Sequence, residues 1–278
     1  MNVQMTQRSI QAERRAARLL AGKVSLVTGS TSGIGLGIAR SLADAGSDIV
    51  LNGFGKSDEI AETTKKIAGD YGVHVIHSSA DMSKPDNIRE MIETALGTYN
   101  RLDIVVNNAG IQHVAPLHEF PPEKWDAVIA INLSSAFHTT RLALPAMLKN
   151  KWGRIINMSS AHGLVASPFK SAYVAAKHGI VGLTKVTALE TAEHGITCNA
   201  ICPGYVYTPL VEAQIDAQAK AHGIPRDRVI REILLAQQPN KRFATVEDIA
   251  ALSMFLASDA AASITGTALP VDGGWTAH

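Results

Sequence analysis

The sequence has few cysteines, almost no net charge and no long apolar run, and each of these absences excludes a class of protein. Its 2 cysteines, Cys198 and Cys202, fit neither the redox motif C-x-x-C nor a zinc site, because their spacing is wrong and no second Cys/His pair lies nearby. We therefore expect two buried thiols in a reducing cytoplasm, and no metal. A net charge of +1 gives no indication of a nucleic-acid or membrane-surface partner. No apolar run approaches the roughly eighteen residues that span a membrane.

What the chain does have is length and an ordinary globular composition. Its 278 residues, 46% of them hydrophobic, suffice for one large domain with a buried core. Residues 1–22 are rich in Arg, Gln and Ala and precede the first predicted strand, so we expect an N-terminal extension that is flexible or forms a helical arm. A targeting peptide is the alternative. Removal of residues 1–21 is expected to leave folding and activity largely unchanged, since residues 23–278 form the domain.

Short apolar runs alternate with helical patterns throughout residues 23–278. Strands are predicted at 23–28, 48–52, 73–78, 102–106, 154–158, 195–201 and 268–271. Such alternation predicts a single α/β domain, built on a doubly wound parallel seven-stranded sheet with helices on both faces. In a sheet of this kind the ligand belongs at the carboxyl ends of the strands.

A glycine-rich loop joins the first predicted strand to the helix that follows it. Gly29 allows the tight turn out of the strand, Gly33 lets the backbone approach a pyrophosphate, and Gly35 lets the helix pack close to the sheet. Free N–H groups at the helix N-terminus favour anions. The loop therefore predicts a dinucleotide site.

Other residues follow strands at the same edge of the sheet. Asn108 and Gly110 close the fourth strand, where small and amide residues suit a backbone that passes near a cofactor. Asp81 comes just after the third strand. It either bonds an adenine amino group or caps the next helix.

Tyr173 and Lys177 are four residues apart on a predicted helix, so phenol and ammonium lie on one face. A free tyrosine titrates near pH ~10, and an adjacent ammonium favours the phenolate and lowers its pKa. Ser160, at the end of the fifth strand, can hold a substrate oxygen while Tyr173 moves the proton. These three residues predict general acid–base catalysis.

Two helical stretches flank this group. One long helix is predicted from about Glu123 to Met147, with Pro145 bending its end. Asn132 interrupts its apolar middle, where a buried amide needs partners and disturbs the helical ladder. It is either a satisfied core group or a water-holder beside the Tyr173 helix. The second stretch, 208–242, is polar and helical, and its length predicts a lid.

With these motifs in place, the chain resembles the short-chain dehydrogenase/reductase family over residues 22–278. The motifs occur in the family's order and spacing: Thr28-Gly29-x-x-x-Gly33-Ile34-Gly35, Asn107-Asn108-Ala109-Gly110, Asn132, Ser160, Tyr173-x-x-x-Lys177 and Pro203-Gly204. The resemblance implies a Rossmann-type fold and a homotetramer. It also implies that Ser160, Tyr173 and Lys177 are the catalytic core, with Asn132 holding a water relay.

The resemblance further implies a nicotinamide dinucleotide as cofactor, and we expect NAD. The residues that would hold it are Gly29, Thr31, Ser32, Gly33, Ile34, Gly35, Phe54, Asp81, Asn108, Gly110, Tyr173, Lys177, Pro203, Val206 and Thr208. The usual NAD discriminator, an acidic residue directly after strand two, is absent, and Lys56 could attract a phosphate. A bulky Phe54 leaves little room for a 2′-phosphate, and the loop 52–55 resembles that of NAD-linked members.

Finer motifs resemble family members that act on small 3-hydroxy acids. These motifs are Leu51–Gly55, Gly110–His113, Ser160–Ser167 and Val271–Trp275. They imply interconversion of (R)-3-hydroxybutyrate and acetoacetate, with Ser160 and Tyr173 at the reacting oxygen and with Gln112, His162, Lys170 and Gln214 around the carboxylate. Tyr205 departs from the tryptophan expected in close relatives. The alternatives are an NADPH-linked 3-oxoacyl thioester reductase and a cofactor-binding sensor without catalysis.

Overall fold

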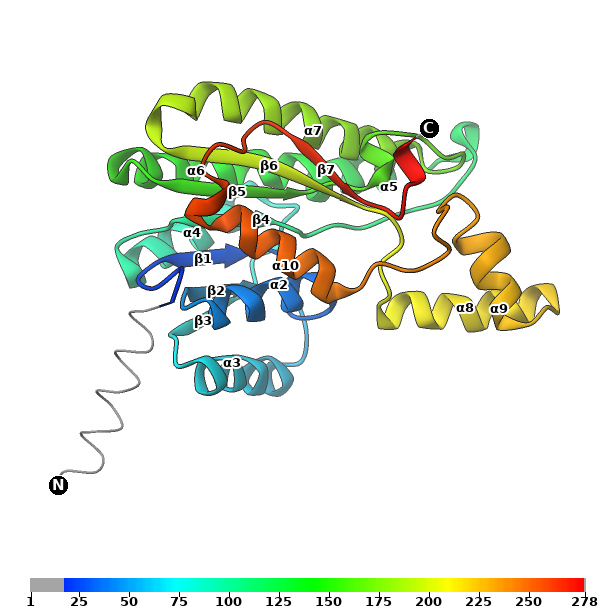
Figure 1. Ribbon diagram of the computed structural model, residues 1–278, viewed down its shortest axis with the longest axis horizontal. Coiled ribbons are helices and arrows are strands. Elements are labelled where there is room, and N and C mark those ends of the chain that lie inside the picture. The colour runs from blue at the N-terminus through cyan, green and yellow to red at the C-terminus, as the bar shows by residue number, and fades with distance from the viewer. Residues whose placement is uncertain (1–17, 278) are drawn as a thin grey trace.

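The computed structural model of the protein describes residues 18–277, and its centre is one seven-stranded sheet (Figure 1). The strand order is β3-β2-β1-β4-β5-β6-β7, and all neighbours pair in parallel. The strands are β1 Val24–Val27, β2 Asp48–Asn52, β3 Val75–Ser78, β4 Ile104–Asn107, β5 Gly153–Met158, β6 Ile196–Pro203 and β7 Ala268–Val271. The predicted fold class is confirmed, and the chain order reverses between β1 and β4.

Helices cover both faces of the sheet, as Figure 1 shows. They are α2 Gly33–Asp44, α3 Ser57–Tyr71, α4 Pro85–Tyr99, α5 Pro122–Ile129, α6 Ser135–Asn150, α7 Ser171–Thr191, α8 Pro209–His222, α9 Arg226–Arg228 and α10 Val246–Ala257. Helices α2, α3 and α10 pack on one face and α4, α6 and α7 on the other. No helix among residues 18–277 combines the length and apolarity needed to cross a membrane.

Successive strand residues enter opposite cores, because side chains alternate across a strand. Val27 and Leu51 join the cluster under α2 and α10, whereas Leu26 and Val50 join the cluster under α4 and α6. All four side chains are fully buried. Near-continuous Val, Ile and Leu runs are what a parallel sheet covered on both faces requires.

The predicted long helix is interrupted at Asn132, and not at Pro145. A π-helical turn, Ala130–Ser134, separates α5 from α6, and α6 continues through Pro145 to Asn150. A bend at Pro145 stays a prediction. The ladder is disturbed where the buried amide sits, as the sequence indicated.

The folded body begins before residue 23. Leu20 is buried in the core, with its amide N–H donating to Ala45 O at 2.8 Å. The Arg18 guanidinium donates to Tyr71 O at 2.6 Å. Residues 18–22 thus contact the body, which moves the expected boundary toward the N-terminus, whereas the effect of removing residues 1–21 stays a prediction. The rest of the expected extension, residues 1–17, lies outside the described residues.

The excursion after β6 is helical, as predicted. It contains α8, α9 and a π-helical turn at Val229–Leu234, and it has its own apolar cluster around Ile215, Val229 and Leu234. In Figure 1 these helices project beyond the carboxyl ends of the strands, which places them beside the expected site. A lid function for them stays a prediction.

Candidate active site

The glycine loop between β1 and α2 is tied to two neighbouring strand ends. Gly29 has a left-handed φ of 61°, and its N–H donates to the Asn52 side chain at 3.2 Å. The Asn108 amide donates to Thr28 O at 2.9 Å and to Gly29 O at 3.0 Å. Asn108 therefore holds the loop in place, which gives the predicted residue a definite structural role.

The other two glycines of the loop differ in their surroundings. A Cβ at Gly35 would lie 2.5 Å from Asn108 Nδ2 and closer still to Gly29 O, so only glycine allows this approach. A Cβ at Gly33 would meet no atom within 4 Å, and φ there is 55°. Open space in front of a helix N-terminus fits a pyrophosphate.

Ser160, Tyr173 and Lys177 come together at the carboxyl end of β5. The Ser160 side chain hydrogen-bonds the Tyr173 phenol. Lys177 Nζ donates to Met158 O at 2.6 Å and lies 5.5 Å from the centroid of the Tyr173 ring. Helix α7 thus presents phenol and ammonium on one face, as their spacing predicts.

Burial decides the protonation of this group. It raises the pKa of Tyr173, although the hydrogen bond from Ser160 opposes the rise. It also lowers the pKa of Lys177 to about 8. The expected lowering of the phenol's pKa by Lys177 is therefore corrected: desolvation dominates, and the ammonium is bonded to a carbonyl. Tyr173 is protonated at neutral pH, which is the form that donates a proton.

Asn132 fastens the segment after β4 to the π-helical turn. Its Oδ1 accepts from Ile111 N at 2.8 Å, and its Nδ2 donates to Ile111 O at 2.9 Å. Gly110 lies against this amide, since a Cβ there would be 3.6 Å from Asn132 Oδ1. The amide is satisfied by backbone groups, so the water relay stays a prediction.

His162 is buried beside the catalytic group and is engaged at both ring nitrogens. Nε2 is 2.8 Å from Ser167 Oγ, and Nδ1 is 3.4 Å from Ser160 Oγ. Its ring meets that of Tyr173 edge-on at 6.0 Å. Burial, with Lys170 adding to it, lowers the pKa of His162 to about 4. The imidazole is therefore neutral at pH 7 and acts through hydrogen bonds, without a charge of its own.

Lys170 precedes α7 and is partly buried, and burial lowers its pKa. Among residues 18–277 no carboxylate pairs with it. Gln112, after β4, and Gln214, on α8, are exposed, and no hydrogen bond within the described chain joins either one to Lys170. The structure thus places His162 beside Tyr173 and close enough to Lys170 to be affected by its charge.

The remaining residues predicted for the cofactor occupy three places. Thr31, Ser32 and Phe54 line one hollow of about 250 Å³. Ile34 packs against the core. Pro203 ends β6, Val206 is buried, and Thr208 caps α8 by accepting from Val211 N at 3.4 Å.

Asp81 does not cap α4, because Lys84 holds that position. The Asp81 carboxylate instead accepts from Ser83 N at 2.9 Å and from Ser83 Oγ at 2.7 Å. The capping alternative is therefore wrong. The adenine contact stays a prediction.

Comparison with known proteins agrees with this geometry. A family model described as enoyl-(acyl carrier protein) reductase matches residues 29–276. The chain belongs to the short-chain dehydrogenase/reductase family. Enzymes of this family use a nicotinamide cofactor, and the open glycine loop described above fits such a group.

Several relatives align over nearly their whole length. D-beta-hydroxybutyrate dehydrogenase from Rhizobium meliloti (strain 1021) is 59% identical, with 92% of this chain and 99% of the relative covered. D-beta-hydroxybutyrate dehydrogenase from Cupriavidus necator is 57% identical, with coverages of 94% and 100%. A crystal structure from Agrobacterium tumefaciens, provisionally named a gluconate dehydrogenase, has a TM-score of 0.83 at 33% identity, with coverages of 93% and 98%.

Trp275 is a member of the site that the sequence reasoning did not assign. It is buried, meets the His162 ring edge-on at 5.1 Å and stacks on Tyr205 at 6.1 Å with an interplanar angle of 5°. Ser167, which bonds His162, was also missed as a site residue. Both residues lie within motifs on which the resemblance rests, Ser160–Ser167 and Val271–Trp275. For Trp275, the signal available in the sequence was an aromatic residue just after the last predicted strand.

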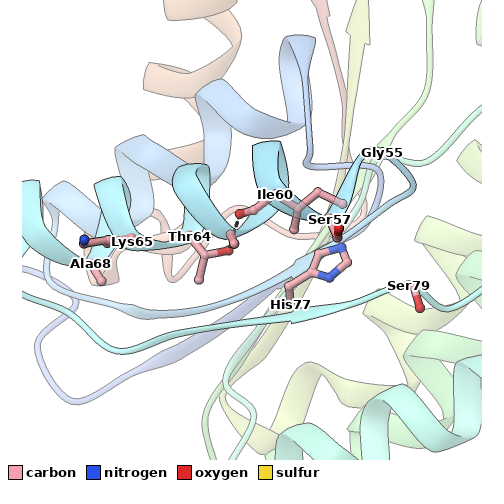
Figure 2. Close-up of a pocket in the computed structure, with 9 residues that line it drawn as sticks. Gly55, Ser57, Ile60, Thr64, Lys65, Ala68, His77 and Ser79 are labelled. Carbon is pink, nitrogen blue, oxygen red and sulfur yellow. Dashed lines mark hydrogen bonds between the residues drawn. The ribbon is translucent and has the colours of Figure 1, made fainter.

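A larger hollow, of about 640 Å³, lies between α3 and β3 (Figure 2). Figure 2 shows His77 directed from β3 toward Ile60 and Ser57 on α3, with Gly55 and Ser79 at one end. The hollow contains none of the catalytic residues. It is therefore not the reaction site, although it shares Gly55 and Ile60 with the smaller hollow beside the glycine loop.

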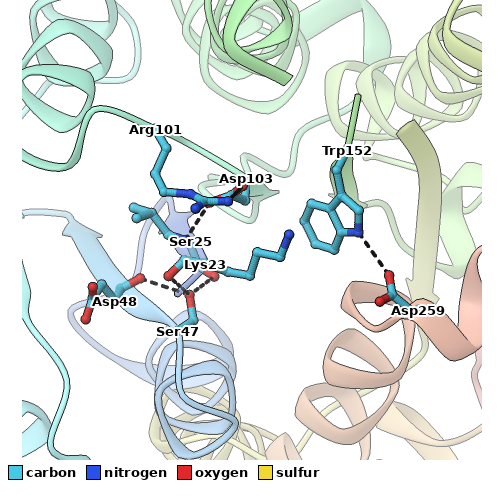
Figure 3. A network of polar contacts seen from close by, with 9 residues as sticks. Lys23, Ser25, Ser47, Asp48, Arg101, Asp103, Trp152 and Asp259 are labelled. Atoms are coloured by element: carbon cyan, nitrogen blue, oxygen red, sulfur yellow. Dashed lines mark hydrogen bonds and ion pairs between the residues drawn. The ribbon is translucent and has the colours of Figure 1, made fainter. Parts of the chain in front are cut away.

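Charged groups also gather at the opposite, amino edge of the sheet (Figure 3). Two cations lie against the ring of Trp152, with Lys23 Nζ 3.6 Å and Arg154 Cζ 4.3 Å from its centroid. Its indole N–H donates to Asp259 at 2.9 Å. Lys23 and Trp152 directly precede β1 and β5, so this network fastens strand ends. Within residues 18–277 no cluster of three or more His, Cys, Asp or Glu is arranged to hold a metal ion.

Proposed function

We propose that this protein interconverts (R)-3-hydroxybutyrate and acetoacetate by hydride transfer to and from NAD. The observation that carries the proposal is the joined Ser160–Tyr173–Lys177 group beside the unpaired ammonium of Lys170. Its support from sequence is the 59% and 57% identity to two D-beta-hydroxybutyrate dehydrogenases. A 3-oxoacyl-(acyl-carrier-protein) reductase from Thermotoga maritima is only 35% identical, so the thioester alternative has less support.

The proposed mechanism assigns one task to each side chain. The Tyr173 phenol gives its proton to the carbonyl oxygen of acetoacetate, and the phenolate takes the hydroxyl proton in the reverse direction. Ser160, bonded to the phenol, fixes the same substrate oxygen. Lys177 supplies positive charge beside the ring. The cofactor, when bound, accepts or supplies the hydride.

The substrate carboxylate is proposed to bind Lys170. The ammonium is partly buried and, in the described chain, has no acidic partner, so an anion would restore the interaction that desolvation removes. Neutral His162 would hydrogen-bond the carboxylate by exchanging one of its contacts with Ser160 or Ser167. Gln112 and Gln214, both exposed, are proposed to contact the same carboxylate.

The test compares (R)-3-hydroxybutyrate with its methyl ester. A charge-assisted hydrogen bond contributes about 1.5–3 kcal/mol, so the ester should be turned over at least about tenfold less efficiently. Lys170→Gln should remove most of that preference, whereas Lys185→Gln should keep it, because Lys185 is an exposed lysine within α7, the helix that Lys170 precedes. Equal turnover of acid and ester by the wild type would contradict the proposed substrate and favour an uncharged or thioester one.

The choice of NAD, the assembly and the compartment complete the proposal. NAD is supported because no cationic side chain lines the hollow beside Phe54. A homotetramer is supported by exposed apolar side chains on α6 and α7, namely Phe137, Val186 and Leu189. Light scattering at several protein concentrations tests it. A cytoplasmic location is supported by the free, buried state of both cysteines.

A further inference from the structure

The hollow beside the glycine loop contains a carboxylate that the sequence reasoning overlooked. Glu59 lies in the first turn of α3 and lines this hollow together with Thr31, Ser32 and Phe54. We propose that Glu59 is the residue that makes the protein select NAD over NADP. The inference rests on the proposed use of NAD and names the group that enforces it.

The position fits a contact with the adenosine ribose. In doubly wound dinucleotide sites an acidic residue roughly twenty positions beyond the glycine loop bonds the ribose 2′-hydroxyl. This chain has no acid directly after β2, because Gly53 and Phe54 stand there. Glu59 enters the same hollow from the next helix, so the missing negative charge is supplied from α3.

Glu59 also pairs with the nearby cation that could bind a phosphate. Lys56 Nζ is 2.8 Å from Glu59 Oε1, one helical turn away. The carboxylate thus offsets part of the positive charge that Lys56 would offer to a 2′-phosphate, although both side chains are exposed. This bears on the question raised by the sequence, which is whether Lys56 attracts the 2′-phosphate of NADP.

Phe54 is a weaker explanation for the same preference. Its side chain is 67% exposed, so it does not close the hollow, and its contact with the loop is through its backbone oxygen, which accepts from Thr31 Oγ1 at 3.0 Å. An exposed ring can turn away from a phosphate. The Glu59 side chain is similarly exposed, at 64%, but its negative charge acts over several ångströms and so repels a phosphate without direct contact.

The test is a binding measurement on the whole chain, without substrate. Dissociation constants for NAD and NADP are measured by titration calorimetry for the wild type, Glu59→Gln and Asp58→Asn. Asp58 is the matched control, because it is exposed, acidic and in the same helical turn, yet it does not line the hollow. Adenosine 2′,5′-bisphosphate and 5′-AMP repeat the comparison without the nicotinamide.

A 2′-phosphate carries about −1.5 to −2 charges. Loss of one carboxylate a few ångströms away should shift the NADP-to-NAD ratio of dissociation constants by about five- to tenfold in favour of NADP. The shift should shrink at 0.5 M salt, because exposed charges are screened. Asp58→Asn should leave the ratio within about twofold of the wild type.

Two results overturn the inference. An unchanged ratio in Glu59→Gln removes Glu59 as the discriminator, and an equal shift in both variants means that only general surface charge is involved. Either result leaves the proposed 3-hydroxybutyrate chemistry intact. Failure of the wild type to bind either dinucleotide would instead overturn the proposed function together with this inference.

Discussion

Gly35→Ala tests the contact that sets the shape of the dinucleotide loop. The new Cβ would lie 2.5 Å from Asn108 Nδ2, where ordinary contact begins at 3.4 Å. The backbone oxygen of Gly29 is closer still, and a backbone atom cannot turn aside. The loop must therefore shift by about 1 Å relative to α2.

The cost follows from two opposing terms. Overpacking of this kind costs about 1–3 kcal/mol, and alanine recovers about 0.5–1 kcal/mol of helix propensity. The net expected loss of unfolding free energy is about 0–2.5 kcal/mol. Gly69→Ala is the matched control, because Gly69 is an exposed helical glycine whose added Cβ would meet nothing within 4 Å. Gly69→Ala should raise the free energy of unfolding by about 0.5–1 kcal/mol.

The assay is thermal unfolding at fixed protein concentration, followed by NADH titration. Gly35→Ala should melt roughly 4–10 °C below Gly69→Ala and bind NADH about tenfold more weakly, because Gly29 and Asn108 are displaced with the loop. If the two variants had the same melting temperature and NADH affinity, the close approach would not be what holds the loop.

Three further predictions follow from burial. Tyr173→Phe should abolish turnover and preserve NADH binding, since it deletes only the hydroxyl; substantial residual turnover would exclude the phenol as acid. The pKa of His162 falls from 6.5 to about 4 on folding. As the pH is lowered, the unfolded chain therefore takes up a proton at this histidine before the folded chain does. Up to about 3 kcal/mol of unfolding free energy that is present above pH ~6.5 is lost between that pH and pH 4. His162→Gln should flatten that part of the stability–pH curve; an unchanged curve would contradict it. A chain starting at residue 22 should unfold at a lower temperature than one starting at residue 18, because it lacks the buried Leu20 side chain, whose burial contributes about 1.5–3 kcal/mol. Equal unfolding temperatures would contradict this contribution of Leu20.

The fold could be read from the sequence because its signals are local. Each predicted strand is present, and the boundaries differ by one or two residues where pairing is non-local. Strand β6, predicted to end at 201, continues to Pro203 because Pro203 pairs with Val271, far along the chain. The π-helical turn depends likewise on Ile111, which satisfies the Asn132 amide from a distant segment.

The site was only partly predictable, because burial and partners are not written in residue spacing. The i, i+4 spacing correctly places Tyr173 and Lys177 on one face, yet it implies a lowered phenol pKa, whereas desolvation raises it. Similarly, the sequence indicates only that His162 lies near the substrate carboxylate, and residue spacing does not give the protonation of its ring. In the structure two hydroxyls and two aromatic rings enclose it, so it is neutral.

The pKa shifts of the titratable side chains in the site all favour the uncharged form, and this bears on which ligand the site binds. Burial pushes Tyr173, His162, Lys170 and Lys177 each toward the uncharged form. A site with this tendency gains most from a ligand that brings negative charge to its cations, because the ion pair then offsets the desolvation that the fold has already imposed. An anionic 3-hydroxy acid does this at Lys170. Its binding should therefore raise the pKa of Lys170, and the complex should take up protons at alkaline pH, whereas a neutral ester would leave proton uptake near zero.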